Sequence, residues 1–172
     1  MTADDHLKQG DLKSALEQLQ AQVKSNPDKV EYRIFLFQLL AVLGQWEKAL
    51  TQLNVAGDLD AATLAMVAMY RQVIACERIR EDVFYGKQEP VVLGQPEEWM
   101  ALQISALKLS ADGSYTQSQA LRTQAFEKAP VMAGQIDGVE FAWLADSDAR
   151  LGPICEAIIE GRYLWIPWTN IK

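Results

Sequence analysis

The strongest constraint on how this chain folds is an internal repeat with a period of 34 residues. Residues 10–19 (GDLKSALEQL) align with residues 44–53 (GQWEKALTQL), which places Gly10 and Gly44 34 positions apart. A glycine permits a tight turn between two antiparallel helices, and the small alanine five residues after it lets those helices approach closely. Pro27 then ends the second helix of the first pair. The repeat therefore predicts stacked pairs of helices.

A period of 34 residues is that of the tetratricopeptide repeat. A weaker third copy follows Gly113, with Pro130 at the spacing found in the first copy and Ser118 in place of the alanine. One long helical pattern, at about residues 61–82, lies between the second and third copies. We expect five or six helices in a mainly α fold, a tetratricopeptide-like solenoid of antiparallel helix pairs over residues 1–130.

Residues 131–172 differ in character and predict a small β-containing C-terminal domain. Residues 141–144 (FAWL) are strand-like, and residues 154–159 and 162–168 flank Glu160-Gly161 as the two strands of a hairpin do. An isolated hairpin is only marginally stable and needs further strands or a helical face. We therefore expect this chain to be a truncated form of a longer protein.

Composition argues against most catalytic and nucleic-acid-binding functions. The chain has 16 Lys and Arg against 23 Asp and Glu, a net charge of −7 that disfavours a phosphate-binding surface. Its single histidine, His6, lies near the N-terminus, which excludes most histidine-based catalysis and multi-histidine metal sites. Cys76 and Cys155 form no C-x-x-C pair and are expected to be reduced and buried. With no signal peptide and no long apolar run, we expect a cytoplasmic, non-enzymatic protein without metal or cofactor.

Asp146, Asp148 and Arg150 form the one acidic cluster that resembles a functional loop. Two carboxylates one residue apart could share a divalent ion, but the other oxygen ligands of a calcium loop are missing. We therefore favour a structural turn, in which the aspartates accept backbone N–H groups and Arg150 is their ion partner.

The predicted solenoid is itself the main candidate for function, because stacked helix pairs present a surface that holds a peptide or helix of another protein. The first helix of the second pair should run from about residue 30 to residue 43 and line this surface. An apolar position within it would suit an amphipathic ligand, although burial against the next pair explains that position equally well. The groove-facing positions are Glu31, Ile34, Gln38 and Ala41.

Tryptophans concentrate in the C-terminal part of the chain, at Trp143, Trp165 and Trp168. They could form the core of the small domain, or they could form an interface, where tryptophan is enriched. The second possibility makes Trp165 and Trp168 candidates for self-association in a general protein–protein scaffold.

Several further segments, spread over nearly the whole chain, form a recognisable set. Its most specific part is the D-x-D-x-R-L-G-P run followed by G-R-Y-x-W-x-P. The complete set is ERIR (77–80), VFYG (83–86), PVVLGQP (90–96) with Trp99, LR (121–122), AFEKAP (125–130), GQIDG (134–138), FAWLADSDARLGP (141–153) and GRYLWIPW (161–168). These segments together resemble the ImpE/SciE family, also called TagJ, of accessory proteins of bacterial type VI secretion.

The resemblance implies a cytoplasmic interaction protein rather than an enzyme. It implies contact with the small subunit of the contractile sheath, through that subunit's N-terminal helix, and a link to sheath assembly and disassembly by an AAA+ ATPase. Family members usually continue past the last residue of this chain. No family motif fixes which residues make the contact. A metal-dependent enzyme using Asp146 and Asp148 is the least favoured alternative.

Overall fold

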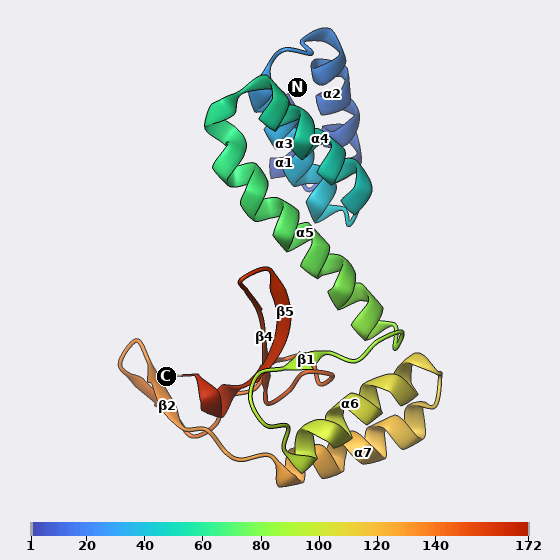
Figure 1. Ribbon diagram of the computed structural model, residues 1–172, viewed down its shortest axis with the longest axis vertical. Coiled ribbons are helices and arrows are strands. Elements are labelled where there is room, and N and C mark those ends of the chain that lie inside the picture. Colours follow the sequence, from blue (N-terminus) through green and yellow to red (C-terminus); the bar gives the residue numbers. More distant parts are fainter. Residues whose placement is uncertain (1, 172) are drawn as a thin grey trace. The chain divides into compact units, whose positions relative to one another are not determined.

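The computed structural model describes residues 2–171 and is mainly helical, with a small sheet near the C-terminus (Figure 1). This confirms the predicted fold class. Every helix in the described range is too short or too polar to cross a bilayer. The chain forms two compact units, one up to Ile74 and one from Ala75. The elements are α1 (Ala3–Lys8), α2 (Leu12–Ser25), α3 (Val30–Val42), α4 (Trp46–Leu59), η1 (Ala61–Thr63), α5 (Leu64–Phe84), β1 (Val91–Val92), α6 (Glu98–Ala111), α7 (Tyr115–Lys128), β2 (Gly134–Ile136), β3 (Val139–Phe141), β4 (Ile154–Ile159), β5 (Arg162–Pro167) and η2 (Trp168–Asn170).

Residues 2–171 contain seven α-helices, more than the five or six expected. The shortest of them, α1, has only six residues, too few for a helical stripe to show in the sequence. It is held by a capping box, in which Thr2 and Asp5 each bond the backbone N–H of the other.

The first unit is built from two helix pairs, α1 with α2 and α3 with α4. Gly10 (φ 77°) and Gly44 (φ 66°) occupy the left-handed region at the two turns, a conformation that side chains with a Cβ rarely adopt. Ala15 and Ala49, five residues beyond these turns, are fully buried where the paired helices meet. The repeated glycine and alanine thus have the roles that the sequence predicted.

The core of the first unit lies among α2, α3 and α4 and extends to the beginning of α5. Leu19, Leu40 and Leu53 are almost completely buried within it. The ring of Phe37 packs edge-on against the ring of Tyr70, with 5.0 Å between centroids. The first half of α5 therefore completes this unit.

The third helix pair, α6 and α7, belongs to the second unit. Gly113 (φ 80°) forms its turn. Ser118, which replaces the repeat alanine, is buried, and its hydroxyl donates a hydrogen bond of 2.6 Å to the backbone carbonyl of Ala106. Because this bond satisfies the buried hydroxyl, serine preserves the close helix contact without leaving an unpaired polar group.

The second unit also contains a three-stranded sheet in the order β1-β5-β4. Strands β4 and β5 pair antiparallel through the two-residue turn Glu160-Gly161, with positive φ at both positions, so the predicted hairpin is confirmed. The third strand, β1, pairs parallel with β5, with Val91 opposite Leu164. The sequence predicted no strand there, because two residues are too few to show an alternating pattern.

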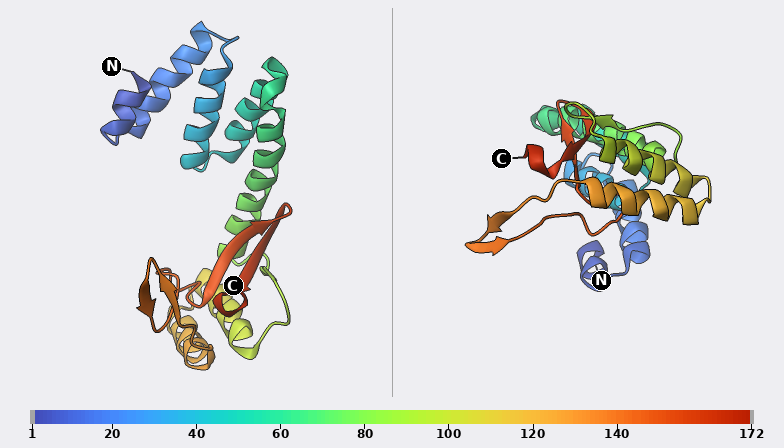
Figure 2. Two further views of the ribbon diagram at one scale, coloured as in Figure 1. Left: turned by 90° about the vertical axis from the view of Figure 1, so that its left-hand side faces the viewer. Right: turned by 90° about the horizontal axis from the view of Figure 1, so that it is seen from below.

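A separate two-stranded hairpin lies between β1 and β4 in the sequence (orange in Figure 2). Strands β2 and β3 pair around Asp137-Gly138, and Gly134 opposite Phe141 is the outermost pair. The prediction of a strand at residues 141–144 was wrong beyond Phe141. The β2–β3 ladder ends at this pair, so residues 142–144 lie outside the strand.

The division into units does not coincide with the boundary expected at residue 130. Trp99 and Met100 of α6 are buried in one hydrophobic cluster with Ile154 and Trp165 of the sheet. The third helix pair and the β elements therefore share a core, and the division lies within α5.

Candidate functional site

The four positions predicted to face a groove form one stripe along α3, because they are three or four residues apart. Glu31 and Gln38 are exposed, whereas Ile34 and Ala41 are half-buried. Ala41 also packs against the core of the first unit. We call these four residues the α3 stripe. Its role in binding stays a prediction.

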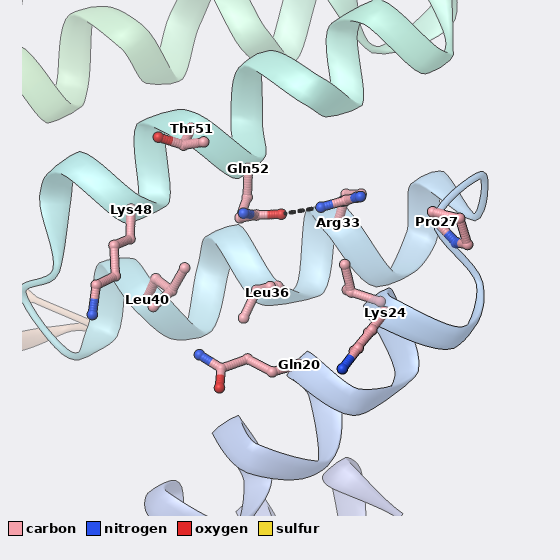
Figure 3. A pocket seen from close by; sticks show the side chains of 10 residues that line it. Gln20, Lys24, Pro27, Arg33, Leu36, Leu40, Lys48, Thr51 and Gln52 are labelled. Atoms are coloured by element: carbon pink, nitrogen blue, oxygen red, sulfur yellow. Dashed lines mark hydrogen bonds between the residues drawn. The ribbon is translucent and has the colours of Figure 1, made fainter.

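A cavity of about 400 Å³ lies between α2, α3 and α4 (Figure 3). Its α3 wall consists of Arg33, Leu36 and Leu40. With about 100° between successive helix residues, these three lie nearly opposite the α3 stripe. Arg33 donates a hydrogen bond of 2.8 Å from Nη1 to Oε1 of Gln52 on α4. No sequence pattern marks this cavity, because it depends on how three helices pack.

The loop between β3 and β4 contains Asp146, Asp148 and Arg150. Asp146 Oδ1 accepts the backbone N–H of Asp148 at 2.7 Å, and Asp148 Oδ1 accepts that of Arg150 at 2.9 Å. Arg150 also pairs with Asp148, with 2.6 Å between Nη2 and Oδ2. The side-chain bond from Arg150, followed by its backbone bond, holds the pKa of Asp148 below its usual 3.8. Across residues 2–171, no group of three or more His, Cys, Asp or Glu is placed to hold a metal ion.

A polar network that the sequence analysis missed connects the end of α5 to the sheet. Arg80 binds both carboxylate oxygens of Glu156, at 2.8 Å from Nε and 3.0 Å from Nη2. The Tyr163 hydroxyl donates to Glu156, and the indole N–H of Trp165 donates to that hydroxyl at 2.7 Å. The available signal was Glu156 itself, a lone carboxylate in the apolar strand ICEAII.

Phe84 links this network to the acidic loop. The guanidinium carbons of Arg80 and Arg150 lie 4.7 and 4.4 Å from the centroid of its ring. The two arginines are therefore held by Glu156, Asp148 and one shared aromatic ring. The arrangement joins α5, the loop and the β4–β5 hairpin by contacts that span distant parts of the sequence.

Protonation in this region is set by burial and by the arginine pairs. Burial, followed by its bond to Glu156, raises the pKa of Tyr163, and the bond to Glu156 raises that of Arg80. Burial also raises the pKa values of the Cys76 and Cys155 thiols. At neutral pH the tyrosine and both thiols are thus protonated, which suits a structural role for these groups.

The C-terminal tryptophans have three different environments. Trp165 is fully buried in the core of the second unit, so the structure argues against the predicted interface role for this residue. Trp168 is half-buried at the start of η2. Trp143 is 68% exposed and is the tryptophan of the three most open to solvent. Burial of Trp165 follows from its place in the central strand, β5.

Two family sequence models match the chain. The tetratricopeptide repeat matches residues 6–73, which hold the two helix pairs of the first unit. The family described as ImpE protein matches residues 138–172, which hold the Asp148–Arg150 loop and the β4–β5 hairpin. All 172 residues align at 52% identity with the type VI secretion system accessory component TagJ of Pseudomonas aeruginosa. These matches confirm the resemblance to the ImpE family.

The chain spans 61% of the length of the curated relative that it matches. It also resembles a solved structure, the X-ray crystal structure of protein VPA1032 from Vibrio parahaemolyticus. That similarity has a TM-score of 0.87 and 26% sequence identity, and it covers 96% of this chain and 62% of the other. The sequence and structural similarities therefore both extend over both compact units.

Proposed function

We propose that this chain is a non-catalytic, cytoplasmic adaptor of bacterial type VI secretion. In this proposal it binds the N-terminal helix of the small sheath subunit and takes part in the assembly or disassembly of the sheath. The observation that carries the proposal is the 52% identity, along the whole chain, with a type VI secretion accessory component. The family resemblance supplies the sheath subunit as the partner.

The first unit supports the proposal physically. Helix pairs of the tetratricopeptide type commonly hold an extended or helical segment of another protein on one side of the stack. The α3 stripe offers the half-buried Ile34 between the exposed Glu31 and Gln38. Such a pattern suits a ligand helix with an apolar face and polar edges. We therefore place the sheath helix on the α3 stripe.

The alternative scaffold, which self-associates through its C-terminal aromatic residues, has less support. Trp165 is fully buried and donates its indole N–H to Tyr163. A side chain in that position contributes to folding rather than to contact with a second molecule.

Titration of the full chain with a fluorescent peptide of the sheath subunit's N-terminal helix tests the proposal. We expect saturable binding in fluorescence anisotropy. The Ile34→Asp variant should bind more weakly, because a carboxylate would replace the apolar centre of the stripe. Ile136→Asp is the matched control, since Ile136 is 57% exposed and lies in β2, outside the stripe.

Two results would count against the proposal. Absence of saturable binding, with circular dichroism showing a folded protein, would contradict the adaptor role. Equal weakening by the two isoleucine variants would contradict the placement on the α3 stripe and leave the partner itself supported.

A further inference from the structure

The cavity between α2, α3 and α4 is basic in a chain that is acidic overall. Lys24, Arg33 and Lys48 line it, and its lining contains no Asp or Glu. They are three of the seven Lys and Arg residues in positions 1–74, within a chain of net charge −7. Clustered cations in a lining that holds no carboxylate create a local positive potential that attracts anionic groups.

Among the described residues, no carboxylate neutralises these cations. Arg33 bonds the neutral amide of Gln52, and its Nε–H has no hydrogen-bond partner among the described residues. Lys48 bonds the neutral side chain of Gln45, at 2.9 Å from Nζ to Oε1. Across residues 2–171, none of the three cations forms an ion pair with a carboxylate. Their capacity for charge-assisted hydrogen bonds therefore remains available to a ligand.

The arrangement of the cations indicates the size of that ligand. Figure 3 shows Lys24 and Lys48 toward opposite ends of the cavity, with Leu36 and Leu40 between them. A small free anion at one lysine would leave the other unpaired. A peptide with acidic residues on both sides of an apolar one places a carboxylate at each lysine and an apolar side chain over the leucines.

We propose that this cavity binds an acidic segment of a protein partner, with carboxylates paired to Lys24, Arg33 and Lys48. The site is distinct from the α3 stripe, because it lies nearly opposite that stripe on the same helix. This proposal for the cavity does not depend on whether the sheath helix binds the α3 stripe. The acidic remainder of the chain repels such a segment and so favours its placement at this cavity.

The test uses the full chain and the fluorescein-labelled synthetic peptide Glu-Glu-Leu-Leu-Glu-Glu. We expect saturable binding in fluorescence anisotropy, weakened by added salt. The Lys24→Gln/Lys48→Gln double variant should lose affinity by at least about tenfold. The Lys13→Gln/Lys29→Gln variant is the matched control, because it removes the same charge from two exposed lysines outside the cavity. Its affinity should equal that of the parent chain.

Further measurements show whether binding requires the carboxylates of the peptide or only its apolar residues, and whether small free anions bind at the same place. The peptide Gln-Gln-Leu-Leu-Gln-Gln should not bind, and inorganic phosphate or glutarate should not compete at matched concentration. The proposal is overturned by absence of saturable binding, by equal loss in the two lysine variants, or by competition from the small anions. Ile34→Asp should leave binding of this peptide unchanged, so the result is separable from that for the sheath helix.

Discussion

Glu156 connects more of the second unit than any other single carboxylate described above. It accepts hydrogen bonds from Arg80 on α5 and from Tyr163 on the neighbouring strand. Tyr163 in turn accepts the indole N–H of the buried Trp165. Linked bonds of this kind polarise one another in a partly buried setting, so removal of the central acceptor affects every member.

Replacement of Glu156 by Gln should therefore destabilise the protein. The variant loses the charge that holds Arg80, whose side chain is 39% exposed, and keeps the carboxamide as a weaker acceptor. Because solvent already screens the pair, we expect the free energy of unfolding to fall by about 1–2 kcal/mol. Urea unfolding followed by circular dichroism measures this. Glu127→Gln, at an exposed position of α7, should change it by less than about 0.5 kcal/mol, and an equal effect of both variants would refute the role assigned to Glu156.

Asp148 should make the stability of the chain depend on pH in the acid range. The side-chain bond from Arg150 lowers its pKa in the folded protein below the usual 3.8. A carboxyl with a depressed folded-state pKa stabilises the protein above its unfolded-state pKa, and this contribution is lost as pH falls through the folded value. The parent chain should thus lose stability below about pH 4, and Asp148→Asn should lose less over that range. Thermal unfolding from neutral to acid pH measures this, with Asp112→Asn as the control. Parallel curves for the parent chain and Asp148→Asn would exclude this contribution.

Site residues that interact with near neighbours in the sequence could be predicted, whereas those that interact with distant positions could not. Asp146, Asp148 and Arg150 bond one another within a few residues, so their spacing alone suggested turns. Arg80 and Glu156 are 76 positions apart, and only the fold brings them together. A single glutamate in an apolar strand indicates that its carboxylate has a partner in the fold. The sequence does not identify which cation that partner is.

At the level of elements, the helix pairs were predictable because their signals are local and repeated. Gly10, Gly44 and Gly113 all adopt positive φ, and a Cβ built on each would meet no atom within 4 Å. The requirement for glycine at these turns is therefore conformational and not steric. Strand β1 and the basic cavity had no such signal, because each exists only where elements separated in the sequence pack together.

Gly44→Ala tests the conformational requirement directly. An alanine at φ 66° destabilises the folded state by about 1–2 kcal/mol, because a Cβ disfavours the left-handed region. Alanine also reduces the conformational freedom of the unfolded chain, which offsets part of this loss. We expect a net loss of about 1 kcal/mol in urea unfolding. Gly44→Asn should lose less, since asparagine tolerates this region better than alanine. If asparagine destabilises the turn as much as alanine does, the conformational explanation fails and a packing contact must be sought.

At the scale of the whole molecule, two separate hydrophobic clusters underlie the two compact units. One cluster consists of side chains from residues 3–74 and the other of side chains from residues 76–165. The repeats and the β-hairpin were both predicted from the sequence. The domain boundary was expected between them, at residue 130. The composition of the chain changes at residue 130, but one hydrophobic core continues across it, because the buried Trp99 and Trp165 belong to the same cluster. A change of secondary structure is thus a poor guide to the limits of a core.

This division predicts that core substitutions act on one unit at a time. Leu53 and Trp165 are each fully buried in a different cluster. Leu53→Ala should destabilise its cluster by about 2–5 kcal/mol and Trp165→Ala by about 3–5 kcal/mol. In hydrogen exchange, the first variant should accelerate exchange of the amides of α2, α3 and α4, and the second should accelerate that of β4 and β5. Leu59→Ala is the control, since Leu59 is 43% exposed on α4 and should leave both sets nearly unchanged. Equal acceleration of both sets by either core variant would mean that residues 2–171 unfold as one cooperative unit, and the assignment of two separate cores would then be wrong.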